Sequence, residues 1–144
     1  MTPRLIRLLP ICIVLGGAIG WAAEPINCPD TVEARQQLTS SAPGWTAMLD
    51  DAPHSLAGVT FYDGLPSEKA SLVYGQITRG KGEQTATWRF APQTNRRIWV
   101  ACSYAGTAIE LTRSLPSDAK TCSVTYDTQQ HIAGLPVIRK IACR

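Results

Sequence analysis

The sequence has only two histidines and no cysteine pair of the C-x-x-C type. Neither histidine, His54 or His131, lies near a cysteine. A zinc site needs clustered thiolate and imidazole ligands, and a redox-active dithiol needs two closely spaced cysteines. A Gly-rich phosphate loop is absent too, because Gly80-Lys81-Gly82 lacks the full motif and a following helix. The sequence therefore predicts no metal site and no cofactor.

No hydrophobic run is long enough for a membrane-spanning helix, which needs about 20 apolar residues. The longest run, Leu8–Ala23, has 16 residues and contains Pro10. A basic segment precedes it, and Gly20-Trp21-Ala22 places small residues at the −3 and −1 positions of a signal-peptidase site. We therefore expect residues 1–22 to be a cleaved signal peptide. The mature chain, 23–144, would be a single β domain that is periplasmic or secreted and has no stable membrane anchor.

Strong charge of either sign is also missing from the expected mature chain. Removing Arg4 and Arg7 lowers the Lys+Arg count from 14 to 12 against 11 acidic residues, a net charge of +1. Residues 23–80 hold 3 bases and 7 acids, and residues 81–144 hold 9 bases and 4 acids. Either the two halves interleave and their charges mix, or they form a dipolar surface that steers a charged partner. The small net charge and the export signal predict no nucleic-acid partner.

Loss of the signal peptide would also remove Cys12 and leave four cysteines. An even number of cysteines in an exported chain indicates two disulfides, and four cysteines allow three pairings. We favour Cys28–Cys143, which would join the chain ends, together with Cys102–Cys122. Pairing of Cys122 with Cys143 across a C-terminal hairpin is the main competitor, and spacing alone does not decide between them.

Alternation of apolar and polar residues predicts a series of short β-strands separated by Gly and Pro. The chain is organised around a hairpin over 97–113, which turns at Tyr104-Ala105-Gly106. Segment 85–90 shows the cleanest alternation. Further strands are expected at 31–38, 45–50, 56–62, 121–126 and 137–143. This pattern predicts a mainly β fold, an antiparallel sandwich or small barrel of about 7–8 strands.

Segment 65–72 is the best helical candidate, because Pro66 and Glu68 suit a first helical turn. Residues 30–33 could also cap a helix, although the alternation that follows favours a strand. Turns or loops are expected at 43–44, 50–55, 79–83, 91–95, 115–118 and 133–136. Trp45, Trp88 and Trp99 lie on predicted strands, and we expect all three in the core. The predicted domain therefore has one short helix and two disulfides.

Asp50, Asp51, His54 and Ser55 form the only cluster that combines an acid, an imidazole and a hydroxyl. A catalytic triad needs a base that reaches the nucleophile and a third group that orients the base. Neighbouring residues on one proline-containing loop seldom project that way. We therefore predict no catalytic residue here, and a small cell-envelope hydrolase with unidentified catalytic residues stays as the alternative function.

Several motifs resemble those of an uncharacterised family of small exported proteobacterial proteins with four cysteines. They are Leu56–Gly64, Trp88-Arg89-Phe90, Trp99 with Cys102–Thr107, and the ending Gly134–Cys143. This resemblance covers nearly the whole mature chain and implies export and the four-cysteine architecture. A weaker resemblance is to the C-type periplasmic lysozyme inhibitors, small β-barrels in which a cysteine shortly precedes a glycine turn, as Cys102 precedes Gly106 here.

Together these features predict a monomeric, non-enzymatic binding or inhibitory protein whose partner is another cell-envelope protein. Tyrosine beside a glycine-containing turn is a common arrangement at interface hot spots. We therefore predict that Tyr62, Asp63, Tyr104 and Thr107 contact the partner.

Overall fold

The structure is a computed structural model that describes residues 25–48, 51–91 and 96–144. The predicted signal peptide, Leu49, Asp50 and most of the predicted turn at 91–95 lie outside these ranges. No helix within them is long and apolar enough to cross a membrane.

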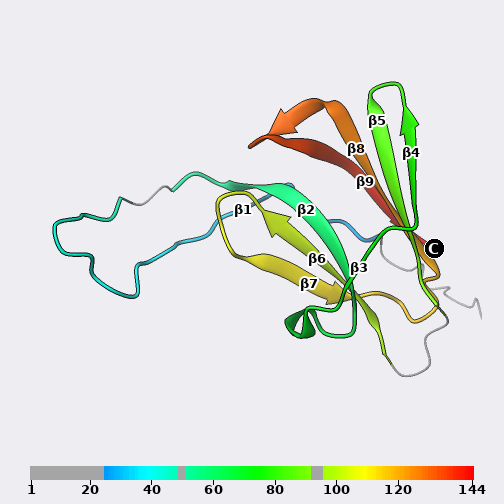
Figure 1. The fold of residues 1–144 in the computed structure, drawn as a ribbon, viewed down its shortest axis with the longest axis horizontal. Helices are drawn as coiled ribbons and strands as arrows, with labels where there is room; N and C mark the ends of the chain where they lie inside the picture. Colours follow the sequence, from blue (N-terminus) through cyan, green and yellow to red (C-terminus); the bar gives the residue numbers. More distant parts are fainter. Residues whose placement is uncertain (1–24, 49–50, 92–95) are drawn as a thin grey trace, which may run out of the picture.

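The chain folds into two antiparallel β-sheets that form separate layers (Figure 1). The first sheet has the strand order β1-β2-β6-β7, and β3 pairs with the other end of β2. In its central ladder β2 pairs with β6, and β6 is the first strand of the predicted hairpin over 97–113. The strands are β1 (Thr31–Val32), β2 (His54–Asp63), β3 (Ser71–Leu72), β6 (Ile98–Tyr104) and β7 (Glu110–Ser114).

The second sheet has the strand order β4-β5-β8-β9, so it consists of two hairpins joined between β5 and β8. Its strands are β4 (Gln76–Gly80), β5 (Glu83–Arg89), β8 (Thr121–Ile132) and β9 (Leu135–Cys143). Each sheet combines strands from both halves of the chain. The acidic and basic halves of the sequence therefore interleave, which favours the first of the two predicted charge arrangements.

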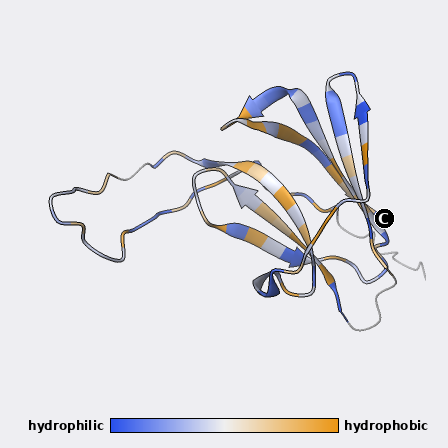
Figure 2. Cartoon of the chain, in the orientation of Figure 1, coloured by the Kyte–Doolittle hydropathy of each residue, from blue (hydrophilic) through white to orange (hydrophobic). Residues whose placement is uncertain are grey.

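The core lies between the two sheets and is built by the alternation that the sequence shows. β2 contacts β8 and β9 across the layers. Figure 2 shows apolar residues recurring between hydrophilic ones along the strands of both sheets. The inward side chains include Val59, Phe61, Ala86, Trp88, Ile98, Val100, Tyr104, Cys122 and Val124. The mainly β prediction is confirmed, and the architecture is a sandwich.

Two of the three predicted core tryptophans lie elsewhere. Trp88 is in the core: it is 5 % exposed, its Nε1–H donates to the Leu72 carbonyl at 3.0 Å, and its ring lies 5.0 Å from Phe61. Trp99 is only half-buried, because Ile98 and Val100 on either side of it occupy the inner face of β6. Trp45 is 85 % exposed.

The disulfide prediction was wrong in its favoured pairing. The bonds are Cys28–Cys102 and Cys122–Cys143. Ile26 and Arg144 line the same hollow of about 390 Å³, so the N-terminal segment of the described chain and the C-terminus do meet. Cys28, however, lies against the inner face of β6, where it bonds to Cys102.

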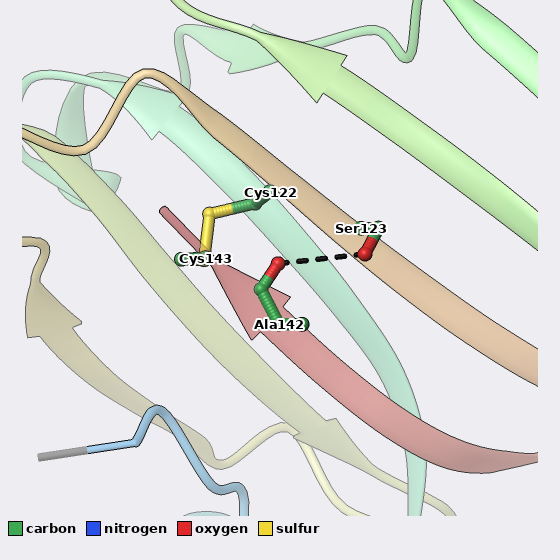
Figure 3. Close-up of a disulfide and its surroundings, with 4 residues drawn as sticks. All are labelled: Cys122, Ser123, Ala142 and Cys143. Carbon is green, nitrogen blue, oxygen red and sulfur yellow. Dashed lines mark hydrogen bonds between the residues drawn. A yellow bond between two sulfur atoms is a disulfide. The ribbon is translucent and has the colours of Figure 1, made fainter.

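The second disulfide joins directly opposite residues of β8 and β9 (Figure 3). Thr121 and Arg144 exchange both backbone hydrogen bonds at 2.9 Å. The next pair, Cys122 and Cys143, therefore occupies a non-hydrogen-bonded position, where opposite side chains are closest. Their Cα atoms are 4.1 Å apart.

Several predicted connections are also corrected. The segment predicted as a helix contains only a 3₁₀ turn, Pro66–Glu68, followed by β3. The turn or loop predicted at 79–83 is confined to a tight turn at Lys81-Gly82, because Gly80 and Glu83 already pair as the ends of β4 and β5. His54 and Ser55, expected in a loop, begin β2. Within the described residues, 33–48 contains no strand, in contrast to the predicted strands there.

Candidate functional site

The four predicted contact residues do not form one surface. Tyr62 and Asp63 lie at one end of the β2–β6 ladder, opposite Trp99 and Ile98. Tyr104 lies at the other end, opposite Leu56. Leu56 and Tyr62 are six positions apart along β2, which is roughly 20 Å at about 3.3 Å per residue.

At the first end, Asp63 is already engaged within the chain. Its Oδ1 accepts a hydrogen bond from Arg96 Nε at 3.3 Å, and its carbonyl accepts one from Arg96 Nη2 at 2.6 Å. Arg96 also forms an ion pair with Glu68 of the 3₁₀ turn. Tyr62 is half-buried beside this cluster, and burial raises the pKa of its hydroxyl, with Glu110 raising it further. This end is therefore a half-exposed polar network in which Asp63 and Glu68 are both paired with Arg96.

At the second end, Tyr104 belongs to the core. Its side chain points between the sheets and the residue is only 3 % exposed. Burial raises the pKa of the Tyr104 hydroxyl, and the carboxylate of Asp30 raises it further. Tyr104 therefore does not present its ring to a partner, contrary to the prediction. Thr107 lies near the surface, and its Oγ1 accepts a hydrogen bond from the Ile109 N–H at 3.2 Å.

The turn after Tyr104 lies beside a cavity of about 480 Å³. The hairpin turn and the segment that follows β1 both line this cavity. Its wall combines apolar and polar residues, so it can take a side chain or a short peptide segment. Its lining includes Arg35, Gln36, His54, Ser55, Ala105 and Gly106.

His54 holds the hairpin turn against the start of β2. Its Nδ1 lies 2.8 Å from the Ala105 carbonyl, which can only accept, so Nδ1 carries the proton. Gly106 has φ +74°, and a Cβ built there would lie 3.3 Å from His54 Nδ1. Glycine is needed for the backbone conformation, and it also lets the imidazole approach closely. His54 thus stabilises the cavity wall.

Asp51, His54 and Ser55 all line this cavity, but they do not form the geometry of a triad. The proton of His54 Nδ1 points to a backbone carbonyl rather than to a carboxylate. Asp50 lies outside the described residues, and His131 is exposed on β8. In the described part of the chain, no three residues among His, Cys, Asp and Glu are grouped to hold a metal ion.

The segment 35–48, called the projecting loop below, extends away from both sheets in Figure 1. Every residue in it is exposed, including large apolar side chains: Leu38 is 68 % exposed, Trp45 85 % and Met48 95 %. A turn closed by a hydrogen bond from the Trp45 N–H to the Ala42 carbonyl, at 3.1 Å, presents Trp45. Exposed tryptophan is uncommon and marks interaction sites. The sequence pattern does not reveal this loop, because the alternation around Trp45 predicts a strand.

A family model for Tli immunity proteins of the type VI secretion system matches residues 51–144, well over half of the 144-residue chain. The chain belongs to this immunity family. An immunity protein binds a partner toxin, so this chain is an inhibitor-type binding protein. No curated protein and no solved structure matches it.

The immunity family model covers β2 to β9, and thus all of the second sheet and most of the first. It does not cover Cys28, β1 or the projecting loop. The resemblance to lysozyme inhibitors agreed with this family in one respect, an inhibitory role. The two differ in the protein that is bound: immunity proteins bind a toxin, whereas the lysozyme inhibitors bind lysozyme.

Proposed function

We propose that the mature protein, beginning at Ala23, is a periplasmic immunity protein that neutralises one type VI toxin by forming a stoichiometric complex with it. The observation that carries this proposal is the family match over β2 to β9 of the sandwich. Residues 1–22 direct export in this account and are then removed.

The two disulfides support the proposed compartment. Disulfides persist in oxidising compartments such as the periplasm and are rare in the cytosol. Cys28–Cys102 ties the N-terminal segment to β6, and Cys122–Cys143 ties the C-terminal strand to β8. A stapled sandwich loses little conformational entropy on binding, and this favours a preformed inhibitor.

The end of the β2–β6 ladder at which Leu56 pairs with Tyr104 supplies the best binding surface. It brings together Thr107, the cavity beside His54 and the start of the projecting loop. At the other end, Asp63 and Glu68 are occupied by Arg96. We therefore place Thr107 at the toxin interface, with Tyr62 and Asp63 outside it.

A competition experiment tests the function. Recipient cells that lack this gene are challenged by the parent strain, with an attacker that lacks type VI secretion as the baseline. The full-length chain should restore survival to the baseline. The same chain without residues 1–22 should not protect, because it would stay in the cytoplasm. Equal killing with and without the full-length chain would refute the immunity function, and protection by the cytoplasmic form would refute the compartment.

A further inference from the structure

The projecting loop is fixed at its base and shaped at its tip. At the base, β1 pairs with β2, and Gln36 Nε2 donates to the Gly106 carbonyl at 2.9 Å. The Cys28–Cys102 bond anchors the segment just before β1. At the tip, Pro43 and Gly44 form the Ala42–Trp45 turn, and Gly44 has φ +82°. Proline followed by a glycine with positive φ is the pattern of a type II turn, which favours one conformation of the tip.

The composition of the projecting loop is that of a protein-binding loop. Arg35 is its one charged residue, and the rest is mainly Ser, Thr, Gln, Ala and Gly with three large apolar side chains. Antibody loops use the same combination, in which small hydroxyl residues adapt and an aromatic residue anchors. Tryptophan is among the residues most enriched at interface hot spots. Loops that bind anionic membranes carry clusters of Lys and Arg, which this loop lacks.

The loop also lies outside the part of the chain that the family model matches, which begins at Asp51. The sandwich is therefore the family's common body, whereas the loop is a feature of this chain beyond it. An immunity protein must distinguish its own toxin from others, and a difference in affinity needs contacts that differ between family members. A protruding apolar tip complements a concave apolar surface.

We propose that the projecting loop is the specificity element of this immunity protein. Trp45 inserts into an apolar pocket of the toxin, and Leu38 and Met48 cover its rim. This inference rests on the proposed function, since it takes the partner to be the toxin. The main contact residue is then Trp45 in the turn at 42–45, and not Tyr62 or Tyr104 as the sequence predicts.

The test uses the effector whose deletion from the attacker abolishes killing of unprotected recipients. This effector is purified, and its binding to the mature protein is measured by calorimetry. Trp45→Ala should weaken binding at least about tenfold and lower recipient survival, with an unchanged melting temperature. Val73→Ala is the matched control, because Val73 is 83 % exposed but lies in the connection between β3 and β4, outside the projecting loop. It should bind within about twofold of the unsubstituted protein, as expected for a residue outside a hot spot.

The outcomes separate this inference from the proposed function. If the unsubstituted protein neither binds the effector nor protects, the immunity function fails. If it binds and Trp45→Ala binds equally well, the immunity function stands and the loop inference is overturned. The inference is also overturned if Trp45 instead mediates self-association in sedimentation runs. Binding of Trp45 to phosphatidylethanolamine–phosphatidylglycerol vesicles, with no effect on effector binding, would overturn it as well.

Discussion

Asp127 and Tyr104 are both buried polar residues, but within the described part of the chain only Asp127 has hydrogen-bond partners for its side chain. Asp127 Oδ1 accepts hydrogen bonds from the N–H groups of Gln129, at 2.7 Å, and Gln130, at 3.1 Å. Its Oδ2 accepts from Arg139 Nε at 3.0 Å. The Tyr104 hydroxyl has no hydrogen-bond partner among the described residues. A buried polar atom without a partner costs stability, whereas a fully bonded carboxylate organises its surroundings.

Tyr104→Phe should therefore leave the protein as stable or make it more stable, by up to about 1–2 kcal/mol, because it removes a buried hydroxyl that lacks a partner. The phenyl ring keeps the packing of the core. Urea unfolding of both proteins measures the difference. A loss of more than about 1 kcal/mol would show that the hydroxyl makes a stabilising bond, since that is the worth of a typical hydrogen bond.

The hydrogen bonds to the Asp127 carboxylate should make the stability of the fold depend on pH. The Arg139 guanidinium, together with the Gln129 and Gln130 N–H groups, lowers the pKa of Asp127 below its ordinary value. The folded state therefore favours the ionised form, and this contribution is complete above the unfolded pKa of about 3.9. It is lost as the pH falls through the lower pKa of the folded state.

Asp127→Asn tests this linkage, because asparagine does not titrate. The free energy of unfolding of the variant should be lower than that of the unsubstituted protein at pH 7. This difference should shrink below about pH 4, where the unfolded carboxyl becomes protonated. The measurement is urea unfolding at a series of pH values, and a difference that stays constant down to pH 2 would exclude the proposed linkage.

At the scale of elements, alternation predicted where the principal strands are, because a strand has a period of two. It located β5, β6 and most of β2 correctly. It did not determine which face is inward on β6, where large apolar residues occupy both sides: Ile98 and Val100 point to the core, and Trp99 points away. Alternation also cannot show whether a partner strand exists, and Trp45 and Ala47 alternate in a loop that has none.

The two tryptophans of the sandwich should respond differently to truncation. Trp88→Ala should cost about 3–5 kcal/mol, because it leaves a cavity between the sheets and removes the bond to Leu72. Trp99→Ala should cost clearly less, since that side chain is half-buried on the outer face. Thermal and denaturant unfolding of both variants gives the comparison. An equal or larger loss for Trp99→Ala would mean that its face of the sheet is covered.

At the scale of the whole molecule, the sequence predicted two disulfides but not their pairing. The four cysteines of the expected mature chain indicate two disulfides, but their spacing does not show which sheet each one reaches. Cys122 and Cys143 are opposite each other only because β8 and β9 form a long hairpin. The projecting loop was unpredictable for a related reason, because exposure depends on what the fold leaves uncovered.

Removing either disulfide should destabilise the fold, and removing the one that closes the longer loop should cost more free energy of unfolding. Cys28–Cys102 spans 74 residues and Cys122–Cys143 spans 21. Loop-closure entropy gives about 4.5 kcal/mol for the first and about 3.4 kcal/mol for the second. Paired Cys→Ala variants, compared by urea unfolding, measure both. A larger loss from the Cys122–Cys143 pair would show that closure entropy does not dominate.

Inhibition by stoichiometric binding is tested most directly by native mass spectrometry of the mature protein mixed with a large molar excess of the purified effector. An inhibitor that acts by binding should give one complex of fixed stoichiometry, and the remaining effector should be free with its mass unchanged. A hydrolase would instead act on many effector molecules. Loss of the excess effector to cleaved or modified products, or the absence of any complex, would contradict inhibition by stoichiometric binding.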